Sequence, residues 1–369
     1  MHGQRRADYK ARQKDPQVAA KLEQKAQQWR QLTAQLPEAP AHVAWELTET
    51  LLRVNPDPLY LWNLRKKMFL EKSQEGDDDN ESLIDKSLSL TAAALKNNPK
   101  SYGAWFHRKW VLCQAARMAE TDATTQILKD LFREELRLTE VFLQRDERNF
   151  HCWNYRRFVV SLQMKPSADG TWCLLSQQKE GKDVQLLQKV MGAQIVLPQK
   201  KLNCDETRRS AEGGTAAAHL LQAEWEFTRA KIAQNFSNFS AFHYRSKLLL
   251  ILWPRVDLNE ELQLVEDAIY TEPDDQTAWW YQAFLLDTIA QHSDAASYYG
   301  RLKQHLEALN ELAEEVAECK WVRLGQIACL KLLPDTKGKR RALWEALVDM
   351  DPDRKARYQH MLAKLEREE

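Results

Sequence analysis

A short motif of aromatic residues and arginine recurs along this chain and constrains its fold more than any other feature. The fullest copy is DERNFHCWNYRRF at residues 146–158, and shorter copies occur at residues 61–65, 101–108, 239–245 and 278–282. In four copies an arginine follows the aromatic residue by three positions: Trp62 with Arg65, Trp105 with Arg108, Trp153 with Arg156, and Phe242 with Arg245. In the fifth copy Gln282 follows Trp279. A motif that returns several times predicts a protein built from structural repeats.

The repeat unit is predicted to be a pair of helices. The 369 residues include only 11 Gly and 12 Pro but 29% charged residues, which favours long helices over short strands and turns. Over residues 41–54, Leu47 and Leu51 share one helical face, and Asn55-Pro56 ends this helix before a second one begins. Neither helix can bury its apolar stripe alone, so successive helical hairpins must stack. The predicted fold class is all-α.

The spacing of the copies divides the chain into segments. The aligned aromatic residues lie 43, 48, 89 and 37 residues apart, which places variable loops between hairpins rather than within them. The predicted segments are an N-terminal arm and helix at 1–40, repeats one to three at 41–164, an insertion at 165–218, repeats four and five at 219–295, and degenerate closing helices at 296–369. The insertion is predicted to be largely disordered, with one short helix over residues 184–191.

Charge and cysteine content restrict the classes of partner and compartment. Lys+Arg and Asp+Glu number 53 each, so no net field attracts nucleic acid or an anionic membrane. The six cysteines form no CxxC pair, which favours free thiols in a reducing compartment. No segment resembles a signal peptide, and no apolar run approaches the roughly 18–20 residues that span a bilayer. The sequence therefore predicts a soluble, cytoplasmic protein.

The aromatic residue and the arginine of each copy have a structural interpretation. Residues three positions apart share one face of a helix. The ring is then expected to fill the junction between hairpins, while the guanidinium binds a neighbouring carboxylate or a carbonyl at a helix end. This interpretation applies to the four arginines of the motif, Arg65, Arg108, Arg156 and Arg245.

The turns that precede two of the second helices carry candidate binding residues. Lys100 and Tyr102 lie in the second copy, and Asn149 and His151 occupy similar positions in the third. The N-terminus of a helix favours anions because its free N–H groups and its dipole point toward them. The positions of these four side chains therefore predict a row of hydrogen-bond donors for a phosphate-bearing ligand. Ordinary capping of the helices is the alternative.

Complete catalytic motifs are missing from the sequence. It contains no GxSxG, HExxH, phosphate-binding P-loop or strand-associated GxGxxG pattern. His107, His151 and His243 lie in the repeats without the spacing of metal ligands. His2, in the N-terminal arm, is a separate candidate that would reach into the site of a partner.

Three stretches carry a family resemblance. NPKSYGAWFHRKWVL at 98–112, DERNFHCWNYRRFV at 146–159 and NFSNFSAFHYRSKLL at 235–249 resemble the repeats of protein prenyltransferase α subunits. The similarity covers about residues 40–160 and 219–360. The MetHisGly start and the segments at 274–279, 319–321 and 351–358 are most similar to the Rab geranylgeranyl (type II) branch of this family. The resemblance implies a right-handed superhelical solenoid, a crescent of antiparallel helical hairpins wrapped around a separate β subunit.

The resemblance also implies an activity that needs partners. In that family branch a heterodimer transfers geranylgeranyl from geranylgeranyl diphosphate to C-terminal cysteines of Rab GTPases, which a Rab escort protein presents. The β subunit holds Zn²⁺ and the isoprenoid, so this chain is expected to bind no cofactor and to be inactive alone. Lys100, Tyr102 and His151 match the α-subunit residues that assist departure of diphosphate, with Asn149 beside them. His2 would contact the zinc site of the β subunit.

Some features depart from the family pattern, and two alternatives stay open. The immunoglobulin-like domain and leucine-rich repeats of animal relatives are not expected here, and Gln282 puts the ion pair of the fifth copy in doubt. One alternative is the α subunit shared by farnesyltransferase and type I geranylgeranyltransferase. The other is a non-catalytic scaffold similar to tetratricopeptide proteins, although spacings of 37 to 48 residues exceed the period of about 34 in that class.

Overall fold

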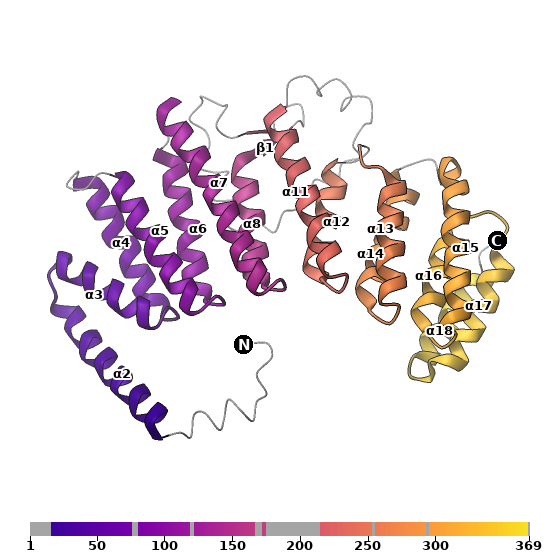
Figure 1. The fold of residues 1–369 in the computed structure, drawn as a ribbon, viewed down its shortest axis with the longest axis horizontal. Helices are drawn as coiled ribbons and strands as arrows, with labels where there is room; N and C mark the ends of the chain where they lie inside the picture. Colours follow the sequence, from indigo (N-terminus) through magenta and orange to yellow (C-terminus); the bar gives the residue numbers. More distant parts are fainter. Residues whose placement is uncertain are drawn as a thin grey trace. The chain divides into compact units, whose positions relative to one another are not determined.

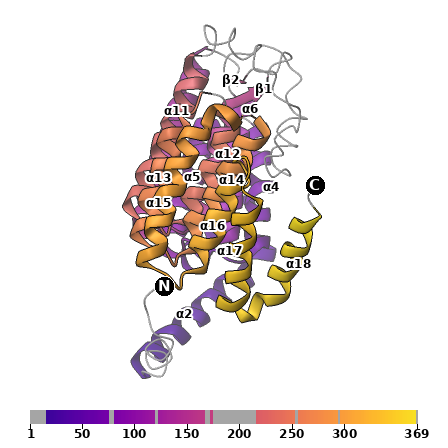
Figure 2. The same cartoon turned by 90° about the vertical axis from the view of Figure 1, so that its right-hand side faces the viewer.

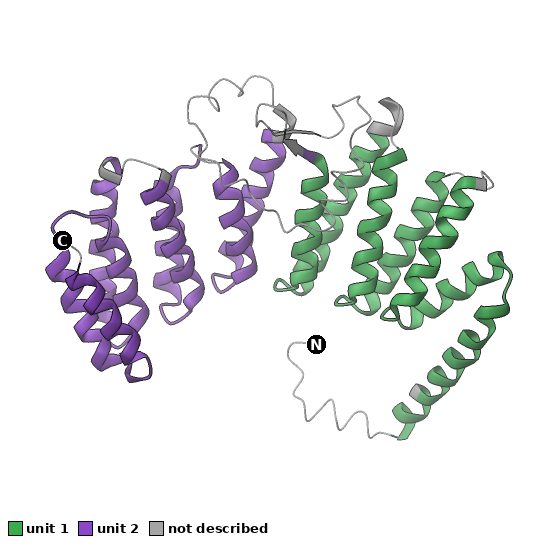
Figure 3. Cartoon of the chain, turned by 180° about the vertical axis from the view of Figure 1, so that it is seen from behind, with its two compact units in different colours: residues 1–163, 178–196 green, residues 164–177, 197–369 purple. Residues whose placement is uncertain are grey.

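The computed structural model of this chain describes residues 16–75, 80–118, 122–166, 172–174, 215–252, 255–292 and 295–367. It divides into two compact units, which are distinguished by colour in Figure 3. Unit 1 contains residues 1–163 and 178–196, and unit 2 contains residues 164–177 and 197–369. Most of the N-terminal arm, including His2, and the predicted helix over 184–191 lie outside the described residues.

Unit 1 is formed by helices. Its elements are α2 (Pro16–Gln35), the short 3₁₀ helix η1 (Leu36–Glu38), α3 (Ala41–Val54), α4 (Leu59–Glu75), α5 (Asn80–Asn97), α6 (Tyr102–Met118), α7 (Asp122–Arg145) and α8 (Phe150–Gln163). Three helical hairpins, α3–α4, α5–α6 and α7–α8, lie side by side in this unit (Figure 1). These hairpins correspond to the first three copies of the motif.

Unit 2 begins with a short strand pair and continues with helices. Its elements are β1 (Met164–Pro166), β2 (Trp172–Leu174), α11 (Thr215–Gln234), α12 (Phe239–Leu252), α13 (Leu258–Thr271), α14 (Gln276–His292), η4 (Ala295–Tyr298), α15 (Tyr299–Glu315), α16 (Lys320–Leu330), α17 (Lys337–Met350), η5 (Pro352–Arg354) and α18 (Lys355–Glu366). The prediction of an all-α fold built from antiparallel helical hairpins is confirmed in both units. The two antiparallel strands lie at the start of the predicted insertion and were not expected from its composition.

In four of the five motif copies, a tryptophan side chain bonds the second helix to the turn that precedes it. The indole Nε1 of Trp62 donates to the carbonyl of Pro56 at 2.8 Å, and Trp153 donates to Glu147 at 2.7 Å. Trp105 and Trp279 make the same bond to the carbonyl six residues earlier, at 2.9 and 2.7 Å. A buried indole N–H needs such a partner, since an unpaired one would destabilise the fold. The ring therefore determines how the chain enters the helix.

The arginine of the motif ties the two helices of its own hairpin together. In four hairpins its Nη1 atom donates to a threonine hydroxyl 17 residues earlier and to a backbone carbonyl 20 residues earlier. The threonines are Thr48, Thr91, Thr139 and Thr228, all buried. The constant separations mean that the two helices of each of these four hairpins pair in the same register. The predicted carboxylate partner is confirmed for Arg108, Arg156 and Arg245, whereas Arg65 binds Thr48 and a carbonyl inside α3.

Two of these arginines also connect neighbouring hairpins of the same unit. In unit 1, Arg108 of α6 binds Glu135 of α7 through Nε and Nη2 at 2.7 and 2.6 Å, and the Tyr155 hydroxyl of α8 donates to the same carboxylate at 2.6 Å. In unit 2, Arg245 pairs with Glu261, which also accepts from the Tyr281 hydroxyl at 2.7 Å. The members of both sets are buried. We call each set of arginine, carboxylate and tyrosine a junction triad.

The fifth copy replaces this triad with a different polar network. Gln282 takes the arginine position, and its Nε2 atom lies 2.7 Å from Nε2 of buried His305. The other ring nitrogen of His305 lies 2.7 Å from Glu266, which Arg301 also binds at 2.7 Å. Glycine is required at Gly325 of α16, because a Cβ atom there would lie 2.8 Å from the Gln282 side-chain oxygen and closer still to an indole ring. The fifth hairpin therefore has no ion pair at the arginine position of the motif. Gln282 instead joins a network in which the carboxylate of Glu266 pairs with Arg301.

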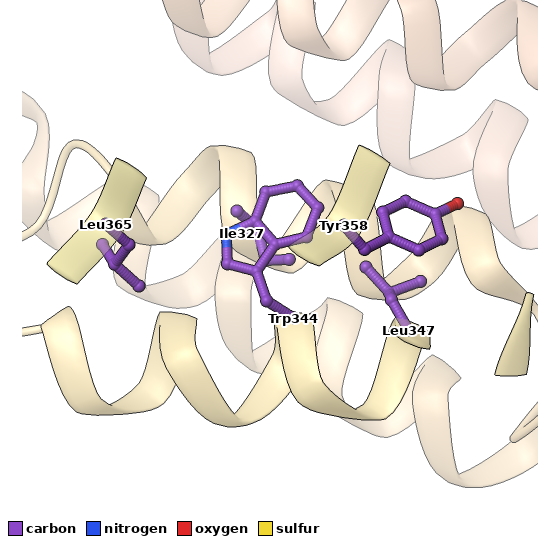
Figure 4. Close-up of a cluster of buried hydrophobic side chains, with 5 residues drawn as sticks. All are labelled: Ile327, Trp344, Leu347, Tyr358 and Leu365. Atoms are coloured by element: carbon purple, nitrogen blue, oxygen red, sulfur yellow. The ribbon is translucent and has the colours of Figure 1, made fainter. Parts of the chain in front are cut away.

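The last three helices of unit 2 share a hydrophobic core. Ile327 of α16, Trp344 and Leu347 of α17, and Tyr358 and Leu365 of α18 form this buried cluster, which Figure 4 shows. In Figure 2, α17 lies next to α16, and α18 follows α17. This arrangement extends the packing of unit 2 into the segment predicted to hold degenerate closing helices.

Polar contacts around one aspartate reinforce the same helices. Asp351 accepts a hydrogen bond from the Tyr358 hydroxyl at 2.8 Å and pairs with Lys320 at 3.1 Å and Arg354 at 2.9 Å. Asp351 itself is buried.

No helix in the described residues is long and apolar enough to cross a membrane.

His107 of α6 is a buried titratable group in unit 1. It is 1% exposed, and its ring centroid lies 4.8 Å from that of Trp62 and 5.5 Å from that of Trp110. Burial, and then the charges of Arg65 and Lys66, hold the pKa of His107 well below its ordinary value. The imidazole is therefore neutral in the folded protein at pH 7.

We expect the depressed pKa of His107 to make unit 1 less stable in mild acid. Below about pH 6.5 His107 is protonated in the unfolded chain but stays neutral in the folded chain. The free energy of unfolding therefore falls by about 1.4 kcal/mol per pH unit until the pKa of His107 in the folded chain is reached. His107→Phe removes this titration. Urea unfolding at pH 7, 6 and 5 should show a shallower pH dependence for the variant than for the parent. Parallel pH profiles would contradict the expectation.

Candidate functional site

The structure places the predicted binding residues at two adjacent turns of unit 1. Lys100 lies in the turn between α5 and α6, and Tyr102 is the first residue of α6. Asn149 directly precedes α8, and His151 is its second residue. The N-termini of α6 and α8 thus carry all four residues, and these helices contact each other. We call Lys100, Tyr102, Asn149 and His151 the turn cluster.

Ring contacts bring two members of the turn cluster together. The ring centroids of Tyr102 and His151 lie 4.2 Å apart with the rings nearly perpendicular, at 89°. Phe150 lies beside both, with its centroid 3.9 Å from His151 and 6.3 Å from Tyr102. Tyr102 is 69% exposed, whereas His151 is only 7% exposed. The phenol therefore stands at the surface in contact with a largely covered imidazole.

Lys100 is held near the same helix end by a carboxylate. Its Nζ atom lies 3.4 Å from Oδ2 of Asp146, which begins the turn before α8. The Lys100 side chain is 44% exposed, so this pair lies at the surface, where an ion pair contributes at most about 1 kcal/mol. Its value here is orientation, because the pair holds the ammonium near the start of α8.

Asn149 has a structural role in this arrangement. It is 1% exposed, and its side-chain oxygen accepts from the backbone N–H groups of His151 and Cys152 at 3.1 and 3.2 Å, which caps α8. Its amide nitrogen donates to the carbonyl of Pro99 at 3.1 Å and so links the two turns. The predicted contact of Asn149 with a diphosphate stays a prediction.

Several cations surround His151. Burial, then the charges of Lys100 and Lys109, lower the pKa of His151 from its ordinary value. Burial, and then the charge of Arg157, likewise lowers the pKa of Lys109, whose Nζ atom lies 5.1 Å from the centroid of the Phe158 ring. At pH 7 the imidazole is therefore mainly neutral and is surrounded by positive charge. The positive ends of the dipoles of α6 and α8 add to this field, which favours a phosphate-bearing anion.

Three charged residues near the turn cluster, Asp146, Lys109 and Arg157, were not predicted from the sequence. Asp146 begins the turn of the third repeat, and the similar placement of Asn98 and Asn235 in their turns is a signal that marks this position. Lys109 and Arg157 each directly follow the arginine of the motif, which is a second periodic signal. These residues could not be assigned to the cluster from the sequence, because Asp146 and Lys109 contact groups on the adjacent hairpin and Arg157 acts on Lys109 from there.

The turn cluster supplies donors without a nucleophile or a metal site. Within the described residues, no group of three or more His, Cys, Asp or Glu side chains is arranged to hold a metal ion. The four cysteines whose side chains the structure describes, Cys113, Cys152, Cys319 and Cys329, are free and buried. Burial raises the pKa of Cys113 to about 11, so its thiol stays protonated and unreactive at neutral pH. The cluster can stabilise negative charge on a ligand that is activated elsewhere.

The repeats match a known family. Residues 84–115, 132–163, 221–252 and 258–289 match the family described as "Protein prenyltransferase alpha subunit repeat". The first two matches cover most of α5–α6 and the hairpin α7–α8, which carry the turn cluster. The other two cover α11–α12 and α13–α14 in unit 2.

Curated relatives carry names from one branch of this family. The geranylgeranyl transferase type-2 subunit alpha of Homo sapiens is 32% identical over 253 residues, which cover 65% of this chain and 33% of the relative. The protein of the same name from Candida albicans is 25% identical over 396 residues, covering 92% of this chain and 91% of the relative. The chain therefore spans about a third of the length of the mammalian relatives it matches.

A solved structure supports the fold. The chain is similar to one from "Candida albicans protein geranylgeranyltransferase-I complexed with GGPP", with a TM-score of 0.58, 16% identity, and coverage of 92% of this chain and 91% of the other. At this identity the similarity concerns the fold alone. The matched repeats and the named relatives agree with the fold, and this chain contains protein prenyltransferase alpha subunit repeats.

Proposed function

We propose that this chain is the α subunit of a type II (Rab) geranylgeranyltransferase. In this proposal it pairs with a β subunit, and the heterodimer transfers geranylgeranyl from its diphosphate to C-terminal cysteines of Rab GTPases presented by a Rab escort protein. The names of the relatives support the branch. The observation that carries the catalytic part is the turn cluster, where Lys100, Tyr102 and His151 gather at the N-termini of two helices.

The chemistry of the transfer explains why an α subunit would carry such a cluster. When the bond between the isoprenoid C1 carbon and the diphosphate oxygen breaks, negative charge develops on the leaving diphosphate. Fixed donors directed at this charge stabilise the transition state more than the ground state. Lys100 would supply a cation and Tyr102 a hydroxyl donor, and neutral His151 would offer one N–H group. Each acts by binding charge, so none has to change its protonation state.

The remaining chemistry is assigned to the β subunit. Zn²⁺ bound there would stabilise the thiolate of the acceptor cysteine, which is the nucleophile of the transfer. This division fits a chain in whose described part no metal-ligand cluster occurs and whose four described thiols are buried. We propose that the zinc and the isoprenoid pocket lie in the β subunit and that the heterodimer acts in the cytoplasm.

Reconstitution with defined partners tests the proposal. The chain is co-expressed with a type II β subunit and assayed with labelled geranylgeranyl diphosphate, an escort protein and a Rab GTPase. We expect transfer to the Rab cysteines only when all components are present, and none with this chain alone. Transfer to a CaaX peptide after pairing with a farnesyltransferase or type I β subunit would instead indicate the shared α subunit. Failure to pair with any β subunit would favour a non-catalytic scaffold.

A further inference from the structure

The first junction of unit 1 departs from the triad found at the next one. Thr91 on α5 and Thr139 on α7 each bind the arginine of their own hairpin, so the two helices have the same register. Four residues before the threonine, α7 carries Glu135, the carboxylate of a junction triad, whereas α5 carries Ser87. The carboxylate position is therefore filled by a neutral, shorter side chain.

The tyrosine position of the same junction is also changed. Two residues after the tryptophan of the motif, α8 carries Tyr155, whose hydroxyl binds the triad carboxylate, whereas α6 carries His107. The arginine position is retained as Arg65. The first junction thus consists of Arg65, Ser87 and His107 in place of an arginine, a glutamate and a tyrosine.

These three side chains are buried and incompletely bonded. Arg65 and Ser87 are 0% exposed and His107 is 1% exposed. Among the described residues, Nε and Nη2 of Arg65, Oγ of Ser87 and both ring nitrogens of His107 have no hydrogen-bond partner. These atoms match the positions that meet at the complete triad of Arg108, where every corresponding polar atom is bonded. Buried polar groups are rarely left without partners, since each one costs about 1–3 kcal/mol.

The first junction also carries an uncompensated positive charge. Burial lowers the pKa of Arg65 to about 10, so its guanidinium is still protonated at pH 7. Glu49 is the carboxylate that acts on it electrostatically, but this side chain is bound to Arg53 at 2.8 Å. The Arg65 guanidinium lies 3.8 Å from the centroid of the Trp45 ring, which offsets part of the charge only. A buried cation normally requires an anion beside it.

We propose that a small monovalent inorganic anion of the size of chloride binds between Arg65, Ser87 and His107. It takes the place of the triad carboxylate and balances the charge of Arg65. The Nε and Nη2 groups of Arg65 donate to it, together with the Ser87 hydroxyl and the one N–H group of neutral His107. A water molecule would satisfy some of the same groups, but it would leave the guanidinium charge unbalanced.

The proposal predicts that unit 1 is stabilised by chloride and that one substitution removes the effect. For the full chain at constant ionic strength, with gluconate replaced stepwise by chloride, the midpoint of thermal unfolding should rise by about 3–5 °C for each tenfold increase in chloride above its dissociation constant. Ser87→Glu installs the carboxylate that the next junction carries. This variant should unfold at a higher temperature in gluconate and should show no dependence on chloride.

A matched control and a direct observation complete the test. Ser89→Glu makes the same chemical change two residues away on the exposed side of α5 and should keep the full chloride dependence. Crystals of the parent chain grown in bromide should show an anomalous peak within about 3.5 Å of Arg65 Nε and Nη2, the range of a charge-assisted contact. Equal unfolding midpoints in chloride and gluconate, chloride dependence that persists in Ser87→Glu, or a water molecule without anomalous signal would each overturn the proposal.

Discussion

Replacing Lys100 by alanine in the assembled heterodimer is expected to lower the rate of geranylgeranyl transfer about 10- to 100-fold. The loss corresponds to one charge-stabilising donor removed from the leaving diphosphate. Because the Lys100 side chain is 44% exposed and its pair with Asp146 lies at the surface, the substitution should leave folding and assembly unchanged. Single-turnover transfer with enzyme in excess isolates the chemical step from product release.

Two further variants separate catalysis from nonspecific charge effects. Lys129→Ala removes an exposed lysine on α7 of the same unit and should transfer at the parental rate. Asp146→Asn leaves Lys100 in place but removes the carboxylate 3.4 Å from its ammonium, so it should lower the rate less than Lys100→Ala does. A parental rate for Lys100→Ala would refute the leaving-group role and favour a purely structural α subunit.

The second large effect is expected on stability, when Glu135 is replaced by alanine. Glu135 is 2% exposed and binds both Arg108 and the Tyr155 hydroxyl. Its removal leaves a buried guanidinium and a buried phenol without their shared acceptor, so we expect a loss of about 3–5 kcal/mol in the free energy of unfolding. Urea unfolding followed by circular dichroism measures this loss.

The neighbouring glutamate provides the control. Glu134 pairs with Arg137 on the exposed surface of α7, with both side chains more than 60% exposed. Glu134→Ala should change the free energy of unfolding by less than about 1 kcal/mol. A loss of similar size in both variants would mean that the junction triad contributes no more than a surface ion pair.

Much of the fold follows from local sequence. The aromatic and arginine motif predicts the repeats, because tryptophan and arginine three residues apart face the same way on a helix. The contacts of Trp153 with its turn and of Arg156 with its own hairpin agree with that prediction. The strand pair of Met164–Pro166 and Trp172–Leu174 was not predicted, because three-residue strands leave no periodic signal.

The partners in the junctions could not be predicted from the motif alone. Glu135 lies 27 residues after Arg108, and Tyr155 lies 20 residues after Glu135, so their meeting depends on how two hairpins stack. Similarly, Lys100 could be identified as a candidate donor by position, but its pairing with Asp146 requires the two turns to be adjacent in space. Family resemblance suggested the roles of the turn cluster, and no local pattern distinguishes these roles from capping.

The constant separation of threonine and arginine has a consequence for how such chains can change in length. An insertion inside a hairpin shifts one partner of the Thr139–Arg156 bond against the other and breaks the carbonyl contact at the same time. An insertion between hairpins disturbs neither bond, and the longest interval between motif copies, from Trp153 to Phe242, spans such a boundary. The separation of 17 residues between threonine and arginine therefore defines how four repeats of this chain align with one another, and sites for added segments should be sought outside it.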